Sequence, residues 1–532
     1  MTRTTNTATN TPLPATLGDL KRSGWRSRTV KEELRANLIA HLREGRELFP
    51  GIVGYDETVV PKVVNALLSG HDFILLGLRG QAKTRLLRSL DRFLDAQLPA
   101  VDGCEINDDP LRPVCAACAR RVAELGDALP IRWIPRAERY HEKLATPDVT
   151  IADLIGDVDP IKAATKKLTF ADPEVVHYGI LPRSNRGIFA VNELPDLSAR
   201  IQVGLLNILE EGDIQIRGFP IRLPLDVLLV FSANPEDYTH RGRIITPLRD
   251  RIASQILTHY PRTLEEGLAI TAQEAWIERE HAPRVVIPPW VREIVEEVAI
   301  QARASELVDH ASGVSARLTI ALLENTVSNA ERRAHAHCED AAVARVSDVI
   351  AASSSITGKV ELVYEGEREG PEKVAKHLSG KAIKAVFDRL FPDVYAADTP
   401  EEAKDSKAPK EPKDSKGAGA PEKMADADYA PIVSWFQGGR TLDVSDGLDD
   451  AELERVLAAV PGLARVAEAW MKPANSAEHA AAMEFVLEGL HQSSLLAKDE
   501  LAGGRVYRDM FEDMMRGLKK GGGGGPKPKG KK

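Results

Sequence analysis

One stretch near the start of the chain constrains the fold more than any other, because an apolar run, a glycine-rich turn and a helical pattern follow one another without a break. DFILL predicts a buried strand, GLRGQAKT (residues 77–84) a turn, and RLLRSLDRFLDAQ an amphipathic helix. In this context the motif G-x-x-x-x-G-K-[ST] binds phosphate groups through backbone N–H groups and the positive end of the helix. The alternative is a glycine-rich turn before a purely structural helix.

The loop departs from this motif at Ala82, which stands where the motif has glycine before Lys83. Alanine is acceptable at this position if its φ is negative, whereas a positive φ would favour glycine. We expect Lys83 to place a positive charge beside the β- and γ-phosphates, and Thr84 to offer its hydroxyl to Mg²⁺. The predicted nucleotide-binding residues of the loop are Gly77, Gly80, Ala82, Lys83, Thr84 and Arg85.

Two later apolar runs end in polar residues suited to nucleotide hydrolysis. The strand in RGIFAVNELPDL ends in Asn192 and Glu193. The glutamate is a candidate general base, while the asparagine stands where an aspartate usually helps to hold Mg²⁺, so we expect looser metal binding and slow turnover. The run LDVLLVFSAN delivers Asn234, which can orient water beside the γ-phosphate.

Two arginines, Arg249 and Arg251, follow near the end of this region, where an arginine can stabilise the transition state in a neighbouring subunit. Taken singly, Asn234 also fits a turn before Pro235, and the two arginines also fit a solvated helix face. The order of the motifs along the chain favours a site.

In this order the motifs resemble those of AAA+ ATPases, and within them the magnesium-chelatase I-subunit and MoxR group. The resemblance covers residues 47 to about 330 and rests on FPGIVGYDE, HYGILPRSNRGIFAVNELPDL and EEGDIQIRGFPIRLPLDVLLVFSANP. The last run also predicts a β-hairpin by its alternation. SGVSARLTIALLEN is similar to a lid motif whose arginine touches the nucleotide, which makes Arg317 a candidate second sensor. Alanine at the position of Ala82 is common in the MoxR group and in minichromosome-maintenance helicases.

The resemblance implies ATP and Mg²⁺ as cofactors, and a ring of identical subunits, commonly six, that remodels a client protein or assists metal insertion into it. Such proteins typically work with a partner that carries a von Willebrand factor A domain. We expect that domain on another polypeptide, because DVSDG (residues 443–447) has Gly447 in place of the last serine of D-x-S-x-S. The alternatives are a nucleotide-gated scaffold with little hydrolysis, motivated by Asn192, and an ATP-dependent transcriptional or nucleic-acid regulator.

We expect an α/β fold: a P-loop AAA+ core with a parallel sheet flanked by helices, an all-helical lid and a separate small helical C-terminal domain. A helix with Leu34, Leu38 and Leu42 on one face leads into the core. The expected parts are a disordered leader (1–25), an AAA+ nucleotide-binding domain (26–262) with an insertion (101–145), a helical lid and extension (263–396), a disordered linker (397–427), a helical domain (428–518) and a basic flexible tail (519–532).

Cysteines in the insertion suggest a metal. Cys104, Cys115 and Cys118 offer three ligands, and His141 is a possible fourth for a structural Zn²⁺; simply reduced thiols are the alternative. We expect Cys338, among the lid helices, to be an ordinary small apolar residue.

Composition limits the remaining classes. The 532 residues carry a formal net charge of −9, which argues against whole-surface binding to nucleic acid. Only four cysteines are present, so a disulfide framework is not expected. The chain has no apolar run long enough to span a bilayer and no apolar core of a secretory signal at its start, so we expect a cytoplasmic protein without membrane insertion.

Overall fold

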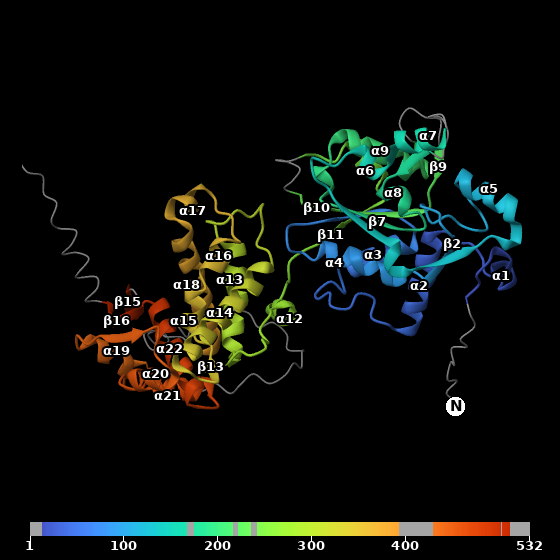
Figure 1. Cartoon of the computed structure of the whole chain (residues 1–532). Coiled ribbons are helices and arrows are strands. Elements are labelled where there is room, and N and C mark those ends of the chain that lie inside the picture. The colour runs from blue at the N-terminus through green and yellow to red at the C-terminus, as the bar shows by residue number, and fades with distance from the viewer. Residues whose placement is uncertain are drawn as a thin grey trace, which may run out of the picture. The chain divides into compact units, whose positions relative to one another are not determined.

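The computed structural model describes residues 13–167, 175–215, 222–235, 242–392, 429–501 and 503–510. The chain divides after Tyr260 into two compact units (Figure 1). The predicted linker and basic tail lie outside the described residues. None of the helices in the described part combines the length and the apolar character that a membrane span needs.

A parallel five-stranded sheet forms the centre of the first unit. Its order is β11 (Ser254–Leu257), β1 (Phe73–Leu76), β10 (Val227–Ala233), β7 (Gly187–Asn192) and β4 (Tyr140–Leu144). Every residue of β7 and β10 is buried, as expected for strands covered on both faces. Because β1, β10 and β7 are parallel neighbours, the loops that follow them meet at one edge of the sheet.

Helices cover both faces of this sheet (Figure 1). One face carries α2 (Val30–Glu44), α3 (Val60–Leu68), α4 (Lys83–Arg88) and the 3₁₀ helix η1 (Ser89–Phe93). The other carries α6 (Ile151–Leu154), α8 (Ile180–Arg183), α9 (Ala199–Glu211) and α11 (Thr246–Arg251).

Alternate residues of the central strands divide between two hydrophobic cores. Along β7, Ile188 and Ala190 belong to the core under α2 and α3, while Phe189 and Val191 belong to the core under α9. Side chains of a strand point to its two faces in turn, so a continuous apolar run can fill both cores. The predicted buried parallel sheet is confirmed.

Two predicted helices differ in detail from those observed. The predicted helix with Leu34, Leu38 and Leu42 is present as α2, but Leu42 is 44% exposed and lies outside the core. The helix expected after the loop is only six residues long as α4, and it continues as the 3₁₀ helix η1. Local periodicity therefore located these helices but did not fix which residues they bury.

The prediction of a disordered leader is corrected for the residues just before position 25. Helix α1 (Leu17–Arg22) is capped by the Thr16 side chain, and both Leu17 and Leu20 are buried. The N–H of Leu17 donates to the carbonyl of Leu129 at 2.9 Å, which joins this helix to the insertion. The cap and two leucines outweigh the polar composition of the segment, because they supply helix capping and apolar burial.

The predicted insertion, residues 101–145, is also corrected, because its last part is β4 and pairs with β7 in the main sheet. The inserted segment is an antiparallel ribbon of β2 (Gln97–Val101) and β3 (Ile131–Pro135). Between these strands lie helix α5 (Ala116–Leu125) and the 3₁₀ helix η2 (Gly126–Ala128), and the 3₁₀ helix η3 (Arg136–Arg139) follows the ribbon.

Smaller elements lie between β4 and β10. An antiparallel pair joins β5 (Gly156–Val158) to β6 (Val176–Tyr178), with α7 (Pro160–Lys166) between them. The 3₁₀ helix η5 (Leu194–Asp196) follows β7. The predicted hairpin is present as β8 (Asp213–Gln215) paired with β9 (Arg222–Pro224), and its tip lies outside the described residues.

The second unit is mainly helical. Its strands β12 (Arg284–Val286) and β13 (Ala341–Val343) form a short parallel pair, so the expected all-helical lid is corrected in this respect. The helices of the segment before the linker are α12 (Leu264–Glu274), α13 (Pro289–Ala304), α14 (Arg317–His337), α15 (Val346–Ala351), α16 (Ser354–Thr357), α17 (Tyr364–Glu369) and α18 (Pro371–Leu390). The helices after it are α19 (Ala430–Gln437), α20 (Asp450–Leu457), α21 (Leu463–Met471) and α22 (Ser476–Gln492).

The predicted separate C-terminal domain is corrected, because the segments on both sides of the linker share one hydrophobic core. Helix α22 is buried on all sides and packs on α18, and the ring of Phe485 stacks on Trp290 with centroids 4.5 Å apart. Its residues from Ala480 to Leu490 are all buried, including Glu484 and Glu488, so this helix needs neighbours on every side. This segment is not wholly helical either, since β14 (Leu442–Ser445), β16 (Gly504–Asp509) and β15 (Leu496–Leu501) form an antiparallel sheet.

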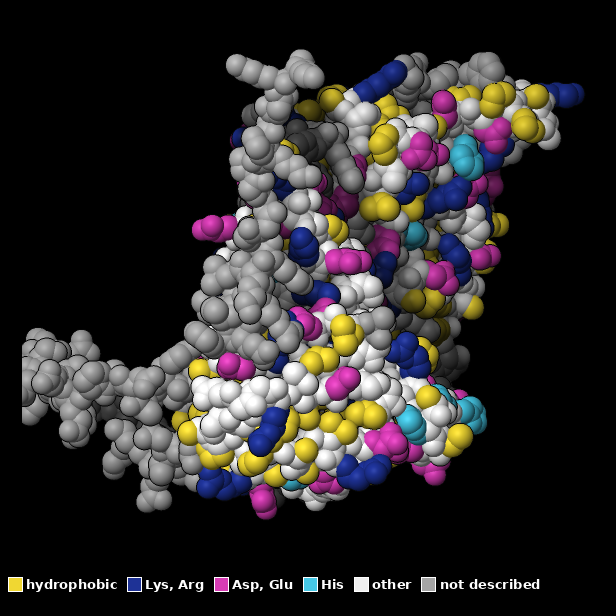
Figure 2. Space-filling view, turned by 90° about the vertical axis from the view of Figure 1, so that its left-hand side faces the viewer, with side chains coloured by type: hydrophobic (Ala, Val, Ile, Leu, Met, Phe, Trp, Pro, Cys, Tyr) yellow, Lys and Arg dark blue, Asp and Glu magenta, His cyan; other side chains and the backbone are white. Residues whose placement is uncertain are grey.

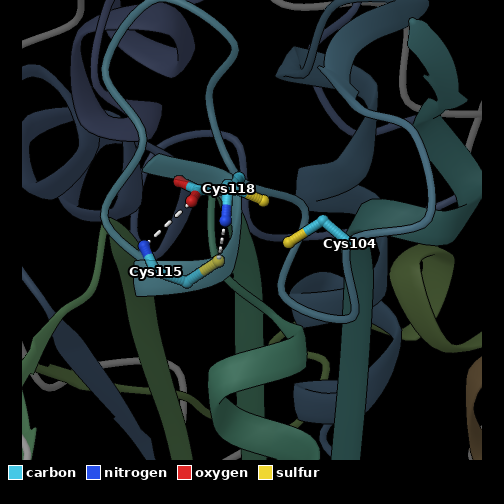
Figure 3. Close-up of side chains that lie close together, drawn as sticks. Cys104, Cys115 and Cys118 are labelled. Atoms are coloured by element: carbon cyan, nitrogen blue, oxygen red, sulfur yellow. Dashed lines mark hydrogen bonds between the residues drawn. The ribbon is translucent and has the colours of Figure 1, made fainter. Parts of the chain in front are cut away.

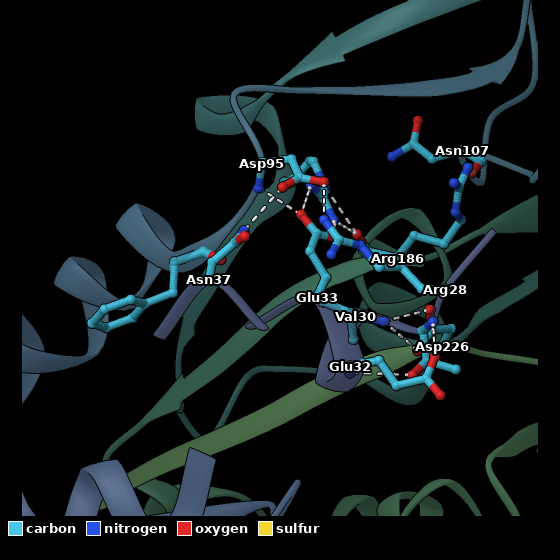
Figure 4. Close-up of polar contacts among 12 residues, drawn as sticks. Arg28, Val30, Glu32, Glu33, Asn37, Asp95, Asn107, Arg186 and Asp226 are labelled. Carbon is cyan, nitrogen blue, oxygen red and sulfur yellow. Dashed lines mark hydrogen bonds and ion pairs between the residues drawn. The ribbon is translucent and has the colours of Figure 1, made fainter. Parts of the chain in front are cut away.

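A buried ion pair fastens α2 to the sheet of the first unit (Figure 4). Nη1 and Nη2 of Arg139 donate to the two carboxylate oxygens of Glu33 at 2.7 and 2.6 Å, and both side chains are almost fully buried. The same guanidinium donates to the carbonyl of Arg186 at 3.0 and 2.7 Å, directly before β7. Removing one partner of such a pair costs about 3–5 kcal/mol, because the other charge stays buried and unpaired.

Asp226, directly before β10, fastens the same helix at its N-terminus (Figure 4). Its carboxylate accepts the N–H of Val30 at 2.8 Å. Burial raises the pKa of Asp226 to about 6, with a further rise from the nearby Glu33 carboxylate, although the Val30 N–H and the guanidinium groups of Arg186 and Arg139 oppose the rise. The folded state therefore favours the protonated form of this carboxyl.

Replacing Asp226 with Asn should change how stability depends on pH. The folded pKa of about 6 lies above the usual value of about 4, so the folded chain holds the proton more tightly, and the wild type loses stability as the pH rises from about 4 to about 6. Asparagine has no proton to lose. Relative to this variant, the free energy of unfolding of the wild type should fall by about 2–3 kcal/mol between about pH 4 and about pH 6, measured by denaturant unfolding.

Asp95→Asn is the matched control in the same cluster. Although burial opposes it, hydrogen bonds from Asn37 and Arg28 lower the pKa of Asp95, so its ionised form stabilises the fold and this contribution is lost as the pH falls. The two variants should therefore show opposite pH trends relative to the wild type. An Asp226→Asn difference that is constant from pH 4 to pH 7 would contradict the role assigned to Asp226.

Candidate functional site

The phosphate loop joins the end of β1 to the start of α4. Lys83 is the first residue of α4 and is buried, and its Nζ donates to the carbonyl of Gly77 and, at 3.0 Å, to that of Leu78. The ammonium is thus held across the start of the loop by backbone oxygens. The short helix leaves its first N–H groups directed to the loop, as the predicted strand, loop and helix require.

Two glycines of the loop are required for different reasons. A Cβ at Gly77 would lie 1.9 Å from the Thr258 hydroxyl oxygen and 2.1 Å from Oε1 of Gln81, so no larger residue fits without displacing them. These two side chains are hydrogen-bonded to each other at 2.6 Å. Gly80 has a φ of +72°, in the left-handed region that favours glycine.

Ala82 also lies in the left-handed region, with a φ of +52° and a ψ of +16°. The condition under which alanine would be acceptable here, a negative φ, is therefore not met. A non-glycine residue in this region carries strain of about 1–2 kcal/mol. Such strain is kept where the surrounding structure fixes the backbone, and here the Ala82 carbonyl already accepts the N–H of Leu86 at 2.9 Å as α4 begins.

Replacing Ala82 with Gly should stabilise the protein. The strain is removed, and the greater freedom of glycine in the unfolded chain offsets only part of this gain, so we expect about 1 kcal/mol in denaturant unfolding. As a control, Ala36→Gly on the exposed side of α2 should destabilise by about 1 kcal/mol, because that alanine has helical geometry. A loss of stability in Ala82→Gly equal to that in the control would contradict the strain at Ala82.

The end of β7 brings Asn192 beside the loop. Oδ1 of Asn192 accepts the hydroxyl of Thr84 at 3.4 Å and the hydroxyl of Ser232 at 3.1 Å. The Ser232 oxygen also accepts the N–H of Glu193 at 3.3 Å. Glu193 has a φ of +56°, so the chain turns sharply where the strand ends. Sequence reasoning missed Ser232, although its place two residues before Asn234 was a signal.

Asn234 follows β10, the strand between β1 and β7. It is buried, and the N–H of Gly77 donates to the carbonyl of the preceding residue, Ala233, at 3.2 Å. Asn234 therefore lies at the same edge of the sheet as the phosphate loop and Glu193. These three segments are the ones that the sequence predicted to form the site.

Two tyrosines brace the loop from outside the predicted set. The Tyr55 hydroxyl lies 2.9 Å from the carbonyl oxygens of both Gln81 and His259, and burial raises the pKa of Tyr55 to about 12. The Tyr260 hydroxyl donates to the carbonyl of Arg79 at 2.9 Å. Tyr55 lies within FPGIVGYDE, so the sequence offered a signal for it; we find none for Tyr260.

The two candidate arginines on α11 differ in their surroundings. Arg251 donates from Nε to Oε2 of Glu210 at 2.8 Å and from Nη1 to the Pro247 carbonyl at 3.1 Å. Arg249 is exposed, and within the described part of the chain no hydrogen bond or ion pair holds its guanidinium. Arg249 is thus available to a neighbouring molecule, whereas Arg251 is held on its own subunit.

Two further arginines were also predicted to contact the nucleotide. Arg85 is exposed on α4, one residue after Thr84. Arg317 is exposed at the N-terminus of α14 in the second unit. Their contacts with a nucleotide remain predictions.

The three cysteines of the insertion come together, but not with His141. Sγ atoms of Cys104, Cys115 and Cys118 and a carboxylate oxygen of Asp108 all lie within 4.8 Å of one another, and all four residues are buried (Figure 3). His141 lies instead on β4, where it pairs with Phe189 of β7, and burial lowers its pKa. The predicted fourth ligand is therefore corrected, and Asp108 was missed.

Cys338 is also corrected. It is exposed and caps the end of α14 with a φ of +56°, so it is not a buried apolar residue. Helix periodicity placed it near the lid helices but did not show that α14 ends there.

The sequence matches no family model. It is similar to the magnesium-chelatase 38 kDa subunit of Cereibacter sphaeroides, with 26% identity over 237 residues, which are 44% of this chain and 65% of that subunit. A stretch of 93 residues is 34% identical to the hydrogenase transcriptional regulatory protein HoxA of Cupriavidus necator, and it covers 17% of this chain and 19% of that regulator. The chain thus spans less than two thirds of the length of each of these relatives.

The first unit has the AAA+ P-loop fold. The parallel sheet, the phosphate loop after β1 and the similarity to a chelatase subunit confirm the predicted resemblance and the predicted P-loop fold of this unit. Among solved structures, a complex of the magnesium-chelatase subunits BchI and BchD is similar at 20% identity, with a TM-score of 0.32, over 60% of this chain and 98% of the matched one.

Proposed function

We propose that the protein binds and hydrolyses ATP as a ring-forming motor of the magnesium-chelatase and MoxR type. The observation that carries this proposal is the edge of the sheet where Thr84, Asn192 and Glu193 meet, linked through the hydroxyl of Ser232. These are the oxygen and carboxylate groups that metal-assisted phosphoryl transfer needs, next to a loop that carries a buried lysine.

The roles we assign follow from these positions. Lys83 would pair with the β- and γ-phosphates, and Glu193 would take the proton of the attacking water. The oxygens of Thr84 and Asn192, 3.4 Å apart, fit a Mg²⁺ ion that binds mainly to the phosphates, because both are neutral ligands. Bound there, Mg²⁺ would neutralise charge on the phosphates. Asn234 would orient the water.

We also propose a client protein that the motor remodels or into which it assists metal insertion. The similarity to a magnesium-chelatase subunit supports this class of client. A partner with a von Willebrand factor A domain belongs to the same proposal. DVSDG begins on β14, within a small antiparallel sheet. This setting supports the proposal that the von Willebrand factor A domain belongs to another polypeptide. A cytoplasmic location stays a prediction.

Steady-state ATP hydrolysis tests the core of this proposal. Glu193→Gln should lower kcat about 100-fold or more, because it removes the general base while keeping the shape of the side chain. Asn192→Asp should lower the Mg²⁺ concentration for half-maximal rate about tenfold, because it restores a charged ligand worth about 1.4 kcal/mol. Asn207→Asp, the same change on the exposed side of α9, is the control and should leave both values unchanged.

Arg249 and Arg251 can be separated by the same assay. Arg249→Ala should lower kcat about 1,000-fold if its free guanidinium acts on the nucleotide of a neighbouring subunit. Arg251→Ala should have a much smaller effect, because Arg251 is held by Glu210. Mixing Arg249→Ala chains with Lys83→Ala chains should restore activity, since mixed interfaces then contain an intact loop and an intact arginine. Mixtures that stay as inactive as their components would contradict action in trans.

Two other functions remain as alternatives. A nucleotide-gated scaffold would bind ATP but hydrolyse it no faster than Glu193→Gln does. The similarity to HoxA over 93 residues favours, as the second alternative, an ATP-dependent transcriptional or nucleic-acid regulator. On the face drawn in Figure 2, basic and acidic side chains of the described residues are interspersed, which argues against a broad basic surface there. Salt-sensitive binding of duplex DNA by the full chain would support the regulator.

A further inference from the structure

We propose that Cys104, Asp108, Cys115 and Cys118 form a structural zinc site that holds the insertion against the start of β7. This proposal does not depend on ATP hydrolysis, because the four residues are separate from the phosphate loop and from the end of β7. It concerns a metal that shapes the core rather than one that takes part in its chemistry.

The geometry of the four side chains suits a tetrahedral Zn²⁺ ion. One ligand atom from each lies within 4.8 Å of the others, and all four residues belong to the buried interior (Figure 3). With Zn–S distances of about 2.3 Å, sulfur ligands of a tetrahedral site lie about 3.8 Å apart, so only a small contraction is needed. The C-x-x-C spacing places Cys115 and Cys118 on the first turn of α5.

Two features of the backbone place positive partial charge near the sulfur of Cys115. Cys115 is the N-cap of α5, and its Sγ accepts the N–H of Cys118 at 3.3 Å. Helix α5 runs for ten residues, so its N-terminus carries a positive partial charge. Thiolates are the form of cysteine that binds metal, and both features stabilise the charge on this sulfur.

Asp108 gives an independent reason to expect a cation at this site. Its side chain is fully buried, and its carboxylate accepts the N–H groups of Asp109 (3.0 Å), Val114 (2.9 and 3.0 Å) and Cys115 (2.9 Å). Within the described residues, no lysine or arginine forms an ion pair with it. A buried carboxylate without a positive partner is costly, and a divalent cation among three sulfurs would provide that partner. Hydrogen-bonded carboxylates of this kind are well oriented as metal ligands.

The site would act on the strand that carries the catalytic candidates. Between the first cysteine and Asp108, the carbonyl of Ile106 accepts Nδ2 of Asn185 at 3.1 Å, and Nδ2 of Asn107 donates to the carbonyl of Arg183 at 3.2 Å. Arg186 donates to the Pro99 carbonyl at 2.7 Å, directly before β7 begins. A metal that fixes this loop therefore fixes the segment from which β7 starts.

Zinc content of the full-length protein tests the proposal directly. Protein purified without chelators should contain about one zinc ion per chain by elemental analysis, and Co²⁺ put in its place should give the thiolate-to-metal absorption and the visible bands of a tetrahedral site. Cys118→Ser should lose the metal, whereas Cys338→Ser, the control at the exposed cysteine, should keep it. Asp108→Cys should keep one zinc ion and resist a chelator longer than the wild type.

Wild-type protein alone gives a second measurement in case a variant fails to fold. A thiol reagent should modify only Cys338 at first, and chelation should make the three other cysteines reactive and lower the melting temperature. Absence of zinc together with absence of a Co²⁺–thiolate band would overturn the site, as would a disulfide among the three cysteines in freshly purified protein. Unchanged zinc affinity in Asp108→Ala would overturn the assignment of Asp108.

Discussion

The buried ion pair between Glu33 and Arg139 is the contact on which the arrangement of the first unit depends. It joins α2 to the residue directly before β4, and the same guanidinium binds the carbonyl of Arg186 directly before β7. The Arg139 side chain therefore fixes the position of α2 relative to β4 and β7. Because β7 ends at Asn192 and Glu193 follows it, a shift at Arg139 would reach the candidate site through the length of the strand.

The sequence was sufficient to predict the fold of this unit, because its evidence is local and repeated. Apolar runs such as FILL and VLLVFSA are long enough for buried parallel strands, and polar residues at their ends mark one edge of the sheet. Because these strands are parallel neighbours, Thr84, Asn192 and Asn234 lie at the same edge of the sheet. This placement can be predicted without knowing any side-chain contact. For this reason the resemblance and the predicted sheet agree with the structure.

What the sequence could not supply depends on contacts between distant segments. The φ of Ala82 is set by the fit of the whole loop, so the sequence left open whether it is negative or, as observed, positive. Asp108 lies beside the three cysteines, and His141 does not, because the chain turns back so that the Cys115 N–H donates to the Asp108 carboxylate. In the same way, the composition of the linker says nothing about which core α22 joins, and α22 packs on helices from the other side of that linker.

Lys83 has a consequence for how a ligand would enter the site. Its ammonium already has backbone oxygens of Gly77 and Leu78 as partners, so a phosphate would compete with these carbonyls for the N–H groups of Lys83. Binding is then an exchange, and its net gain is the difference between two sets of contacts. A ligand with several adjacent phosphates gains most from the exchange, because one oxygen can displace a carbonyl while others reach the N–H groups of α4. In the proposed function, the loop would therefore favour ligands with several phosphates over those with one.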